Sequence, residues 1–384
     1  MAGEVAEIIA VTPDEQTFVY TDSATGSIGA VSLKNPRSPR QLWTLELGGE
    51  PTSVAMTRDG RRALVAVDTT DGAFATPSGH LASVDLRRRT VEVRVDLGGQ
   101  PDSVALTHDS RTVAVAIENQ RDEEVVVGGV QGGLPQAPAG FLAVVDLVGS
   151  PKKRQADRVD LTGLEGGLFA SDPEPEYVDV NRQGVAAVTL QQNNAVALVD
   201  LARRSVIRSF SAGAVVRDDA DTADDGVIAF DDVLVAPREP DTIQWTPSGD
   251  LLTADEGDLF AEPGGGRGWT VFSPRGRVLW TSGSSAERAR RGHAYPDDRS
   301  DDKGAEFEGA EVATLRGTRY AFVASERGDA VLVYDIGRVD RPRLLQVLAV
   351  GEAPEGLLAL ERRGLFLSAN EDDGTLSVFG LVRR

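Results

Sequence analysis

The fold of this chain is decided by a short sequence pattern that returns along its length. It reads PDSVALTHDSRTVAVAIE at residues 101–118, and a near copy, PTSVAMTRDGRRALVAVD, stands at residues 51–68. Apolar and β-branched residues flank a compact turn of Asp, Gly or Ser, which is the pattern of a β-hairpin. Five more copies begin near residues 6, 175, 240, 307 and 354.

Seven units spaced by tens of residues predict a solenoid, a propeller or an array. The third unit adds two further strand patterns, FLAVVDL at residues 141–147 and RVDLTGL at residues 158–164. Seven units of four antiparallel strands predict an all-β, seven-bladed β-propeller that occupies residues 1–384 as a single domain. No fourth strand pattern follows TLSVFGLVRR at residues 375–384. We therefore expect either an incomplete last blade or a longer parent that supplies an N-terminal strand, and we favour the longer parent because an open edge invites aggregation.

Composition excludes several classes of function. The chain has 60 acidic and 40 basic residues and a formal net charge of -20, which opposes binding to nucleic acid and to anionic membranes. It contains no cysteine, which excludes disulfides, thiol catalysis and zinc–thiolate sites. No apolar run is long enough to span a bilayer, so no membrane insertion is expected. The first residues do not form a signal peptide, so the chain is either cytoplasmic or has lost its leader.

Three insertions interrupt the repeats, and the first is a loop at residues 120–140 that contains several Gly and Pro residues. Residues 216–239 are densely acidic, and residues 284–306 form a long charged connection. A short helical period stands at residues 284–292 within that connection. Long insertions in a compact domain are usually functional or disordered.

Acidic residues recur at the start of the first strand of each unit. This first acidic set holds Glu7, Thr52, Asp102, Glu176, Asp241, Glu308 and Glu355. In a propeller these positions converge near the central channel, where the carboxylates repel one another unless cations or protons neutralise them. Oxygen ligands of this kind suit Ca²⁺ or Mg²⁺. The alternative is a water-filled channel lined by partly protonated acids.

A second acidic set ends the second strand of each unit. It holds Asp22, Asp68, Glu118, Gln191, Glu256, Glu326 and Glu371. Solvated, turn-forming side chains are the favoured interpretation, except for Glu326 and Glu371, which stand in similar settings, VASERGD and SANEDDG. From the two sets the candidate metal ligands are Glu176, Asp241, Glu308, Glu355, Glu326 and Glu371.

The segment DTADDGVIAFDD at residues 221–232 partly resembles a twelve-residue calcium loop. Asp221, Asp225 and Asp232 fall at its first, fifth and twelfth positions, and they join the candidate ligands. Ala223 stands at the third position, where a ligand is expected, and no helices flank the segment. The alternative is an acidic, disordered loop.

Several motifs, in order, resemble the choice-of-anchor I family of secreted bacterial propellers. The most specific is DDRSDDKGAEFEG at residues 297–309, and PEPEYVDVNRQGVAAVTLQQNNAVALVDL, DADTADDGVIAF, TADEGD, APEGLLAL and SANEDDGTLSVF also match. Ala305 and Phe307 replace prolines of the family pattern, and Gln192 replaces a glutamate. The resemblance implies an exported propeller that is anchored at the cell surface or released. Family members often carry alkaline phosphatase or phytase-esterase-like labels.

Two main hypotheses of function follow. The first is a non-catalytic, exported scaffold with an acidic face that holds calcium and binds an unidentified small molecule or protein. The second is a metal-dependent phosphoesterase, with catalytic candidates Glu308, Glu355, Asp301, Asp302, Arg299 and Lys303. In the second hypothesis the two basic residues contact a phosphate group. The alternative for that pair is ion pairing with the neighbouring aspartates. A cytoplasmic interaction propeller is a third, weaker hypothesis.

Overall fold

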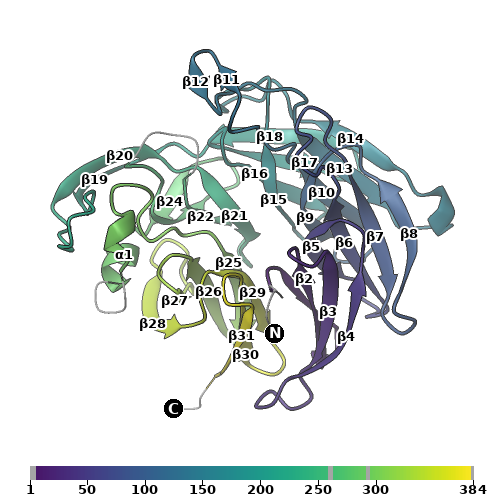
Figure 1. Ribbon diagram of the computed structural model, residues 1–384. Coiled ribbons are helices and arrows are strands. Elements are labelled where there is room, and N and C mark those ends of the chain that lie inside the picture. The colour runs from purple at the N-terminus through teal and green to yellow at the C-terminus, as the bar shows by residue number, and fades with distance from the viewer. Residues whose placement is uncertain (1–5, 258–262, 291–294, 382–384) are drawn as a thin grey trace. The chain divides into compact units, whose positions relative to one another are not determined.

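The computed structural model describes residues 6–257, 263–290 and 295–381. Four-stranded antiparallel sheets follow one another along the chain and are drawn as successive groups of arrows in Figure 1. Contacts group the chain into two compact units, one from Ile8 to Phe210 and one from Ser211 onward, which also takes in Glu7.

The first unit contains four blades. The first two consist of β1 (Ile9–Val11), β2 (Thr17–Asp22), β3 (Ser27–Ser32) and β4 (Arg40–Glu46), then β5 (Glu50–Met56), β6 (Arg62–Asp68), β7 (Gly79–Asp85) and β8 (Thr90–Asp96). The next two consist of β9 (Pro101–Leu106), β10 (Thr112–Ile117), β13 (Phe141–Asp146) and β14 (Ala156–Asp160), then β15 (Pro175–Val180), β16 (Val185–Leu190), β17 (Ala195–Asp200) and β18 (Ser205–Ser211). A small hairpin, β11 (Val126–Val127) and β12 (Val130–Gln131), and a 3₁₀ turn, η1 (Pro151–Lys153), extend the third blade.

The second unit contains three blades. They consist of β21 (Pro240–Trp245), β22 (Leu251–Asp255), β23 (Gly268–Phe272) and β24 (Val278–Thr281), of β25 (Ala310–Leu315), β26 (Thr318–Ser325), β27 (Ala330–Asp335) and β28 (Arg343–Ala349), and of β29 (Pro354–Leu360), β30 (Leu365–Asn370) and β31 (Thr375–Gly380). The acidic insertion forms a hairpin of β19 (Ala214–Ala220) and β20 (Asp232–Pro237). The charged connection holds α1 (Ser285–Arg290) and the 3₁₀ turn η2 (Asp297–Arg299).

The fold class is therefore the all-β, seven-bladed propeller that the repeats predicted. Among the described residues the last sheet has three strands, which agrees with both alternatives for the last blade and does not decide between them. The helical period near residue 284 is confirmed by α1. None of the described helices is long and apolar enough to cross a membrane.

Strand burial follows from the position of each strand in its blade. The second strand of a blade is almost wholly buried, as β10 shows, whereas the outermost strand, such as β4, is mostly exposed. Apolar residues of adjacent blades pack together, so that Leu64 and Ala66 of one blade meet Val113 and Val115 of the next. In the second unit Phe322 stacks on Phe366 with ring centroids 4.1 Å apart. The core therefore lies between the sheets, which is where burial of apolar area stabilises a stack of blades.

The proline that opens most repeats produces a β-bulge. Pro101 pairs with Ile117 and Val104 with Val115, so two residues of β9 lie opposite one residue of β10. The same shift follows Pro240 in β21 and Pro354 in β29. Proline lacks the N–H that a regular ladder needs, which explains why it stands at a bulge. The acidic residue after each proline therefore lies in an irregular stretch of strand, where a bulge redirects side chains.

Candidate cation site

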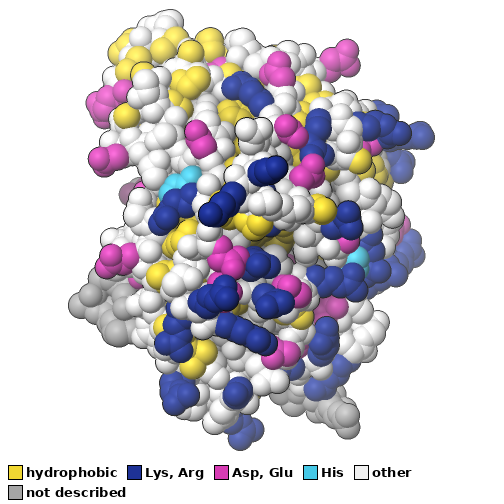
Figure 2. Space-filling view, turned by 90° about the vertical axis from the view of Figure 1, so that its right-hand side faces the viewer, with side chains coloured by type: hydrophobic (Ala, Val, Ile, Leu, Met, Phe, Trp, Pro, Cys, Tyr) yellow, Lys and Arg dark blue, Asp and Glu magenta, His cyan; other side chains and the backbone are white. Residues whose placement is uncertain are grey.

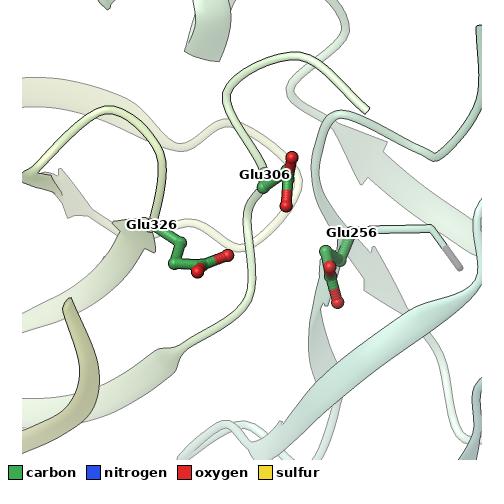
Figure 3. A group of neighbouring side chains, drawn as sticks. All are labelled: Glu256, Glu306 and Glu326. Atoms are coloured by element: carbon green, nitrogen blue, oxygen red, sulfur yellow. The ribbon is translucent and has the colours of Figure 1, made fainter. Parts of the chain in front are cut away.

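Three carboxylates of the second unit meet in one place. Glu256, Glu306 and Glu326 each offer one oxygen, and these oxygens all lie within 4.8 Å of one another. Figure 3 shows the three side chains pointing into the same space from three separate segments. Among the described residues this is the one group of three such ligands. We call Glu256, Glu306 and Glu326 the carboxylate cluster.

The fold brings the cluster together from the ends of strands. Glu256 directly follows β22 and Glu326 directly follows β26, so both belong to the second acidic set. Glu306 precedes β25 and has a φ of 40°, a left-handed conformation that costs a non-glycine residue energy and is often found at functional sites. Nearby, Gly304 has a φ of 65°, and a Cβ there would lie 2.4 Å from Glu287 Oε1. Glycine accepts the positive φ and has no Cβ that would collide with Glu287. The connection can therefore pass close to the buried Glu287.

Three basic side chains contact the carboxylate cluster. Lys303 Nζ lies 2.5 Å from Glu256 Oε1 and 3.7 Å from Glu306 Oε2. Arg299 donates from Nε and Nη2 to Glu306 Oε1 at 2.8 and 2.6 Å. Arg327 lies 3.2 Å from Glu326 and 3.5 Å from Glu306. The cluster therefore already holds an ammonium group, and its own chain neutralises part of its negative charge.

A fourth acid, Glu308, belongs to the same electrostatic group. Burial raises its pKa well above the usual value, and the negative charges of Glu256, Glu326, Asp241 and Glu355 raise it further. The first and second acidic sets therefore interact within the second unit. Burial also raises the pKa of Glu326 to about 7, assisted by Glu306 and Glu256 and opposed by Arg327. These carboxyls are under-compensated near neutral pH, and protons or a cation would relieve them.

A buried ionic network supports the segment that carries Lys303 and Glu306. Arg267 is fully buried and donates to the carbonyl oxygens of Gly264, Asp221, Ser300 and Asp302 at 2.6–2.9 Å. Glu287 of α1 is also fully buried, and its oxygens lie 3.2 Å from Arg217 and 4.0 Å from Arg267. Buried charges are tolerated when they are paired and hydrogen-bonded. This network fixes the connection against β19 and α1.

Of the predicted metal ligands, Glu326 joins the carboxylate cluster and Glu308 interacts electrostatically with its Glu256 and Glu326. Asp241 and Glu355 interact electrostatically with Glu308. Glu371 is exposed and lies outside the cluster. Glu176 is buried in the first unit, as part of the bulge after Pro175. In that unit burial raises the pKa of Asp102 to about 7.

The turn-forming interpretation of the second acidic set describes two residues of the first unit. Asp22 Oδ1 accepts a hydrogen bond from the backbone N–H of Thr25 at 3.0 Å, and Asp68 Oδ1 accepts one from Thr70 at 2.8 Å. In the second unit the same position of the repeat carries Glu256 and Glu326. The longer side chains of these two glutamates reach a shared space.

The segment at residues 221–232 connects β19 to β20, and its carboxylates make local hydrogen bonds. Asp221 Oδ2 accepts from Ala229 N at 2.8 Å, Asp225 Oδ1 accepts from Val227 N at 2.9 Å, and Asp232 Oδ2 accepts from Thr222 Oγ1 at 2.7 Å. None of the three belongs to the one group of neighbouring ligands found among the described residues. Calcium binding by this segment stays a prediction.

The basic residues of the phosphoesterase hypothesis are engaged within the protein. Arg299 pairs with Asp302, as the sequence alternative expected, and also with Glu306. Lys303 pairs with Glu256, which lies 47 residues away in the sequence. Asp301 is exposed. The sequence reasoning did not single out Glu306 or Arg327; the signal for Glu306 is its place two residues before Glu308 in the motif AEFEG.

The fold and the carboxylate cluster define a propeller with an acidic site at the ends of its strands. The chain belongs to the Choice-of-anchor I domain family, which matches residues 7–262 and 262–339. Family and fold together support a surface-type propeller scaffold. A search of the curated proteins gives no match.

Two solved structures show the same fold at low sequence identity. Kuenenia stuttgartiensis hydrazine synthase is 15% identical, with a TM-score of 0.65, and the match covers 99% of this chain and 97% of that one. The β-propeller domain of Myceliophteria thermophila Cps50 (Swd1) is 11% identical, with a TM-score of 0.63 and coverage of 100% and 98%. At these identities the likeness concerns the fold alone.

Proposed function

We propose that this chain is an exported or cell-surface propeller that acts as a non-catalytic binding scaffold, and that its carboxylate cluster binds Ca²⁺. The observation that carries the proposal is the convergence of Glu256, Glu306 and Glu326 within 4.8 Å. Ca²⁺ binds carboxylate oxygens at about 2.3–2.6 Å and tolerates irregular geometry, so oxygens at this mutual spacing can share one ion.

The charge balance also supports a cation at this place. The ammonium group of Lys303 contacts two of the three carboxylates, so the cluster is already shaped around a positive charge. Glu308 adds a half-buried carboxyl whose pKa is raised by desolvation and by four acidic neighbours. A divalent ion that displaces Lys303 would compensate more negative charge than the ammonium group does.

The bound ion would order the loops that carry the three glutamates. These loops follow β22 and β26 and precede β25, so they belong to two blades of the second unit. A ligand of the scaffold could then contact a surface whose shape depends on calcium. The unidentified small-molecule or protein ligand of the first hypothesis belongs on this surface.

Isothermal titration calorimetry of the EDTA-treated protein with CaCl₂ tests the proposal. We expect one saturable binding event that weakens at least tenfold in Glu256→Gln and in Glu326→Gln. Glu371→Gln is the matched control, because Glu371 has the same position in its repeat but is exposed and outside the cluster. Asp225→Asn tests whether the segment at residues 221–232 contributes to the binding, and we expect it to leave the calcium affinity of the cluster unchanged. Absence of saturable binding, or equal weakening in Glu371→Gln, would contradict the proposal.

The surface location has its own test. Fractionation of the native host with an antibody against this chain should find the protein in the medium or on the cell surface. A purely cytoplasmic pool would contradict that part of the proposal and would favour the cytoplasmic interaction propeller.

A further inference from the structure

A pocket of about 400 Å³ lies in the first unit, between the turns of its second and third blades. Its lining comes from the β5–β6 turn, the start of β6, the β9–β10 turn and the connection from β13 to β14. The two turns are tied together, since the backbone N–H of Arg58 donates to Ser110 Oγ at 2.9 Å. The volume is that of a small-molecule site, for which a few hundred Å³ is typical.

Three arginines line this pocket, two from the β5–β6 hairpin and one from the connection after β13. Arg58 lies in the β5–β6 turn, Arg62 begins β6, and Arg154 follows η1. We call the cavity that they line the arginine pocket. Guanidinium groups bind phosphate and carboxylate oxygens through paired N–H donors, which makes arginine the preferred residue for such groups.

The three guanidinium groups are unequally compensated by their own chain. Arg62 Nε donates to Glu92 Oε2 of β8 at 2.6 Å. Arg154 Nη2 donates to the carbonyl oxygen of Leu147 at 2.9 Å, but its Nε is buried and makes no hydrogen bond. The side chain of Arg58 is exposed, and it forms no ion pair with any described residue. Donor capacity therefore remains inside the pocket, and an unsatisfied buried N–H carries a free-energy cost that a ligand oxygen would remove.

Arg154 lies in a positive environment. Burial lowers its pKa, and the charge of Arg62 lowers it further, while Glu92 acts in the opposite direction. An anion between the two guanidinium groups would relieve both burial and repulsion. The exposed Lys152 and Lys153 precede Arg154. Figure 2 shows that Lys and Arg side chains gather on the side of the molecule where Figure 1 draws β7 and β8.

Two acids also line the arginine pocket, and both are held by their own turns. Asp59 Oδ1 accepts from Thr57 Oγ1 at 2.8 Å and from Arg61 N at 3.0 Å. Asp109 Oδ1 accepts in the same way from Thr107 Oγ1 at 2.8 Å and from Arg111 N at 3.1 Å. These hydrogen bonds direct one oxygen of each carboxylate toward the turn, so the acids shape the turns while the arginines retain donors for a ligand.

We propose that the arginine pocket binds a phosphate group, held by Arg58, Arg62 and Arg154. The group can come from a free phosphate ester or from the headgroup of an anionic lipid. Binding of a single phosphate group is compatible with the net negative charge of the chain. The contact is local, so the acidic protein does not have to approach an extended polyanion.

Titration calorimetry with inorganic phosphate and with glycerol 3-phosphate, at constant ionic strength, tests the proposal. We expect saturable binding that weakens at least tenfold in Arg58→Gln and in Arg154→Gln. Arg61→Gln is the matched control, since Arg61 is exposed in the same turn but does not line the pocket. Thermal unfolding of each variant without phosphate verifies folding, and Arg58→Gln preserves the test if Arg154→Gln does not fold. Absence of saturable binding, or equal weakening in Arg61→Gln, would overturn the proposal.

Co-sedimentation with vesicles that contain phosphatidic acid distinguishes the two sources. The ligand is a lipid headgroup if the protein binds the vesicles, if glycerol 3-phosphate displaces it from them, and if Arg58→Gln abolishes the binding. Binding of the soluble esters without vesicle binding assigns a free phosphate ester. Vesicle binding that Arg58→Gln leaves unchanged, with no binding of the soluble esters, would overturn the proposal.

Discussion

Replacing Glu326 by glutamine tests the electrostatics of the carboxylate cluster. In the absence of a cation the Glu326 side chain is mostly buried, with 12% of its surface exposed, and its pKa is raised to about 7. Burial is the main cause, and the charges of Glu306 and Glu256 add to it, against the opposing effect of Arg327. Glutamine keeps the shape of the side chain and cannot ionise.

The sign of the effect follows from proton linkage. Between the ordinary pKa of 4.5 and the raised value of about 7, the folded protein binds a proton that the unfolded chain has lost. The contribution of Glu326 to stability is therefore complete below pH 4.5 and is lost as the pH rises through 7. Each unit of pKa difference corresponds to about 1.4 kcal/mol, so the loss of stability is roughly 3 kcal/mol. This value is an upper bound, because the protonation of neighbouring groups also changes.

We therefore expect Glu326→Gln to exceed the wild type in unfolding free energy only slightly at pH 5 and by up to about 3 kcal/mol at pH 8 in EDTA. Urea unfolding at pH 5, 6, 7 and 8, at constant ionic strength, measures this difference, and Glu124→Gln, at an exposed position of the first unit, is the control. Saturating calcium should reverse the order at pH 8. If Glu326→Gln is less stable than the wild type by the same amount at every pH, the pair with Arg327 dominates and the reasoning is wrong.

Three further predictions concern the surroundings of the cluster. Lys303→Met should raise calcium affinity about tenfold, or about 1.4 kcal/mol, because it removes the ammonium group 2.5 Å from Glu256; unchanged or weaker binding in calorimetry would show that Lys303 does not compete. Arg267→Met should lower the unfolding free energy by about 3–5 kcal/mol, because it leaves four carbonyl acceptors without their donor and removes one of the two arginines that neutralise the buried Glu287; a loss below about 1 kcal/mol in urea unfolding would refute a structural role for the network. Phe322→Ala should cost about 3–5 kcal/mol by the same measurement and leave calcium affinity almost unchanged, whereas an equal loss of affinity would mean that core packing controls the site.

The sequence predicted the fold well because the propeller repeats one local solution seven times. Thr57 and Asp59, and Thr107 and Asp109, build the same hydrogen-bonded turn in successive blades, so each copy supports the interpretation of the others. The β-bulge was not predicted. Its signal, a proline at the start of an otherwise regular strand such as β21, was present in the sequence, but only pairing registers show which residues it displaces.

The candidate site was predicted in part. The repeat placed Glu326 and Glu308 among the candidates because residues at equivalent positions of neighbouring blades lie close together. It could not place Glu306, whose side chain depends on a left-handed backbone conformation, or the pairing of Lys303 with Glu256. Both features arise from the path of the connection between two blades, which no local pattern specifies.

Thermal unfolding with and without calcium decides whether the carboxylate cluster is a calcium site. A ligand that binds only the folded state adds about 2.7 kcal/mol of stability at a hundredfold excess over its dissociation constant. We predict that calcium raises the unfolding midpoint of the EDTA-treated wild type at pH 7.5, and that Glu256→Gln abolishes the rise while Glu371→Gln retains it. A midpoint that calcium does not change, or a rise that Glu256→Gln retains in full, would contradict the account.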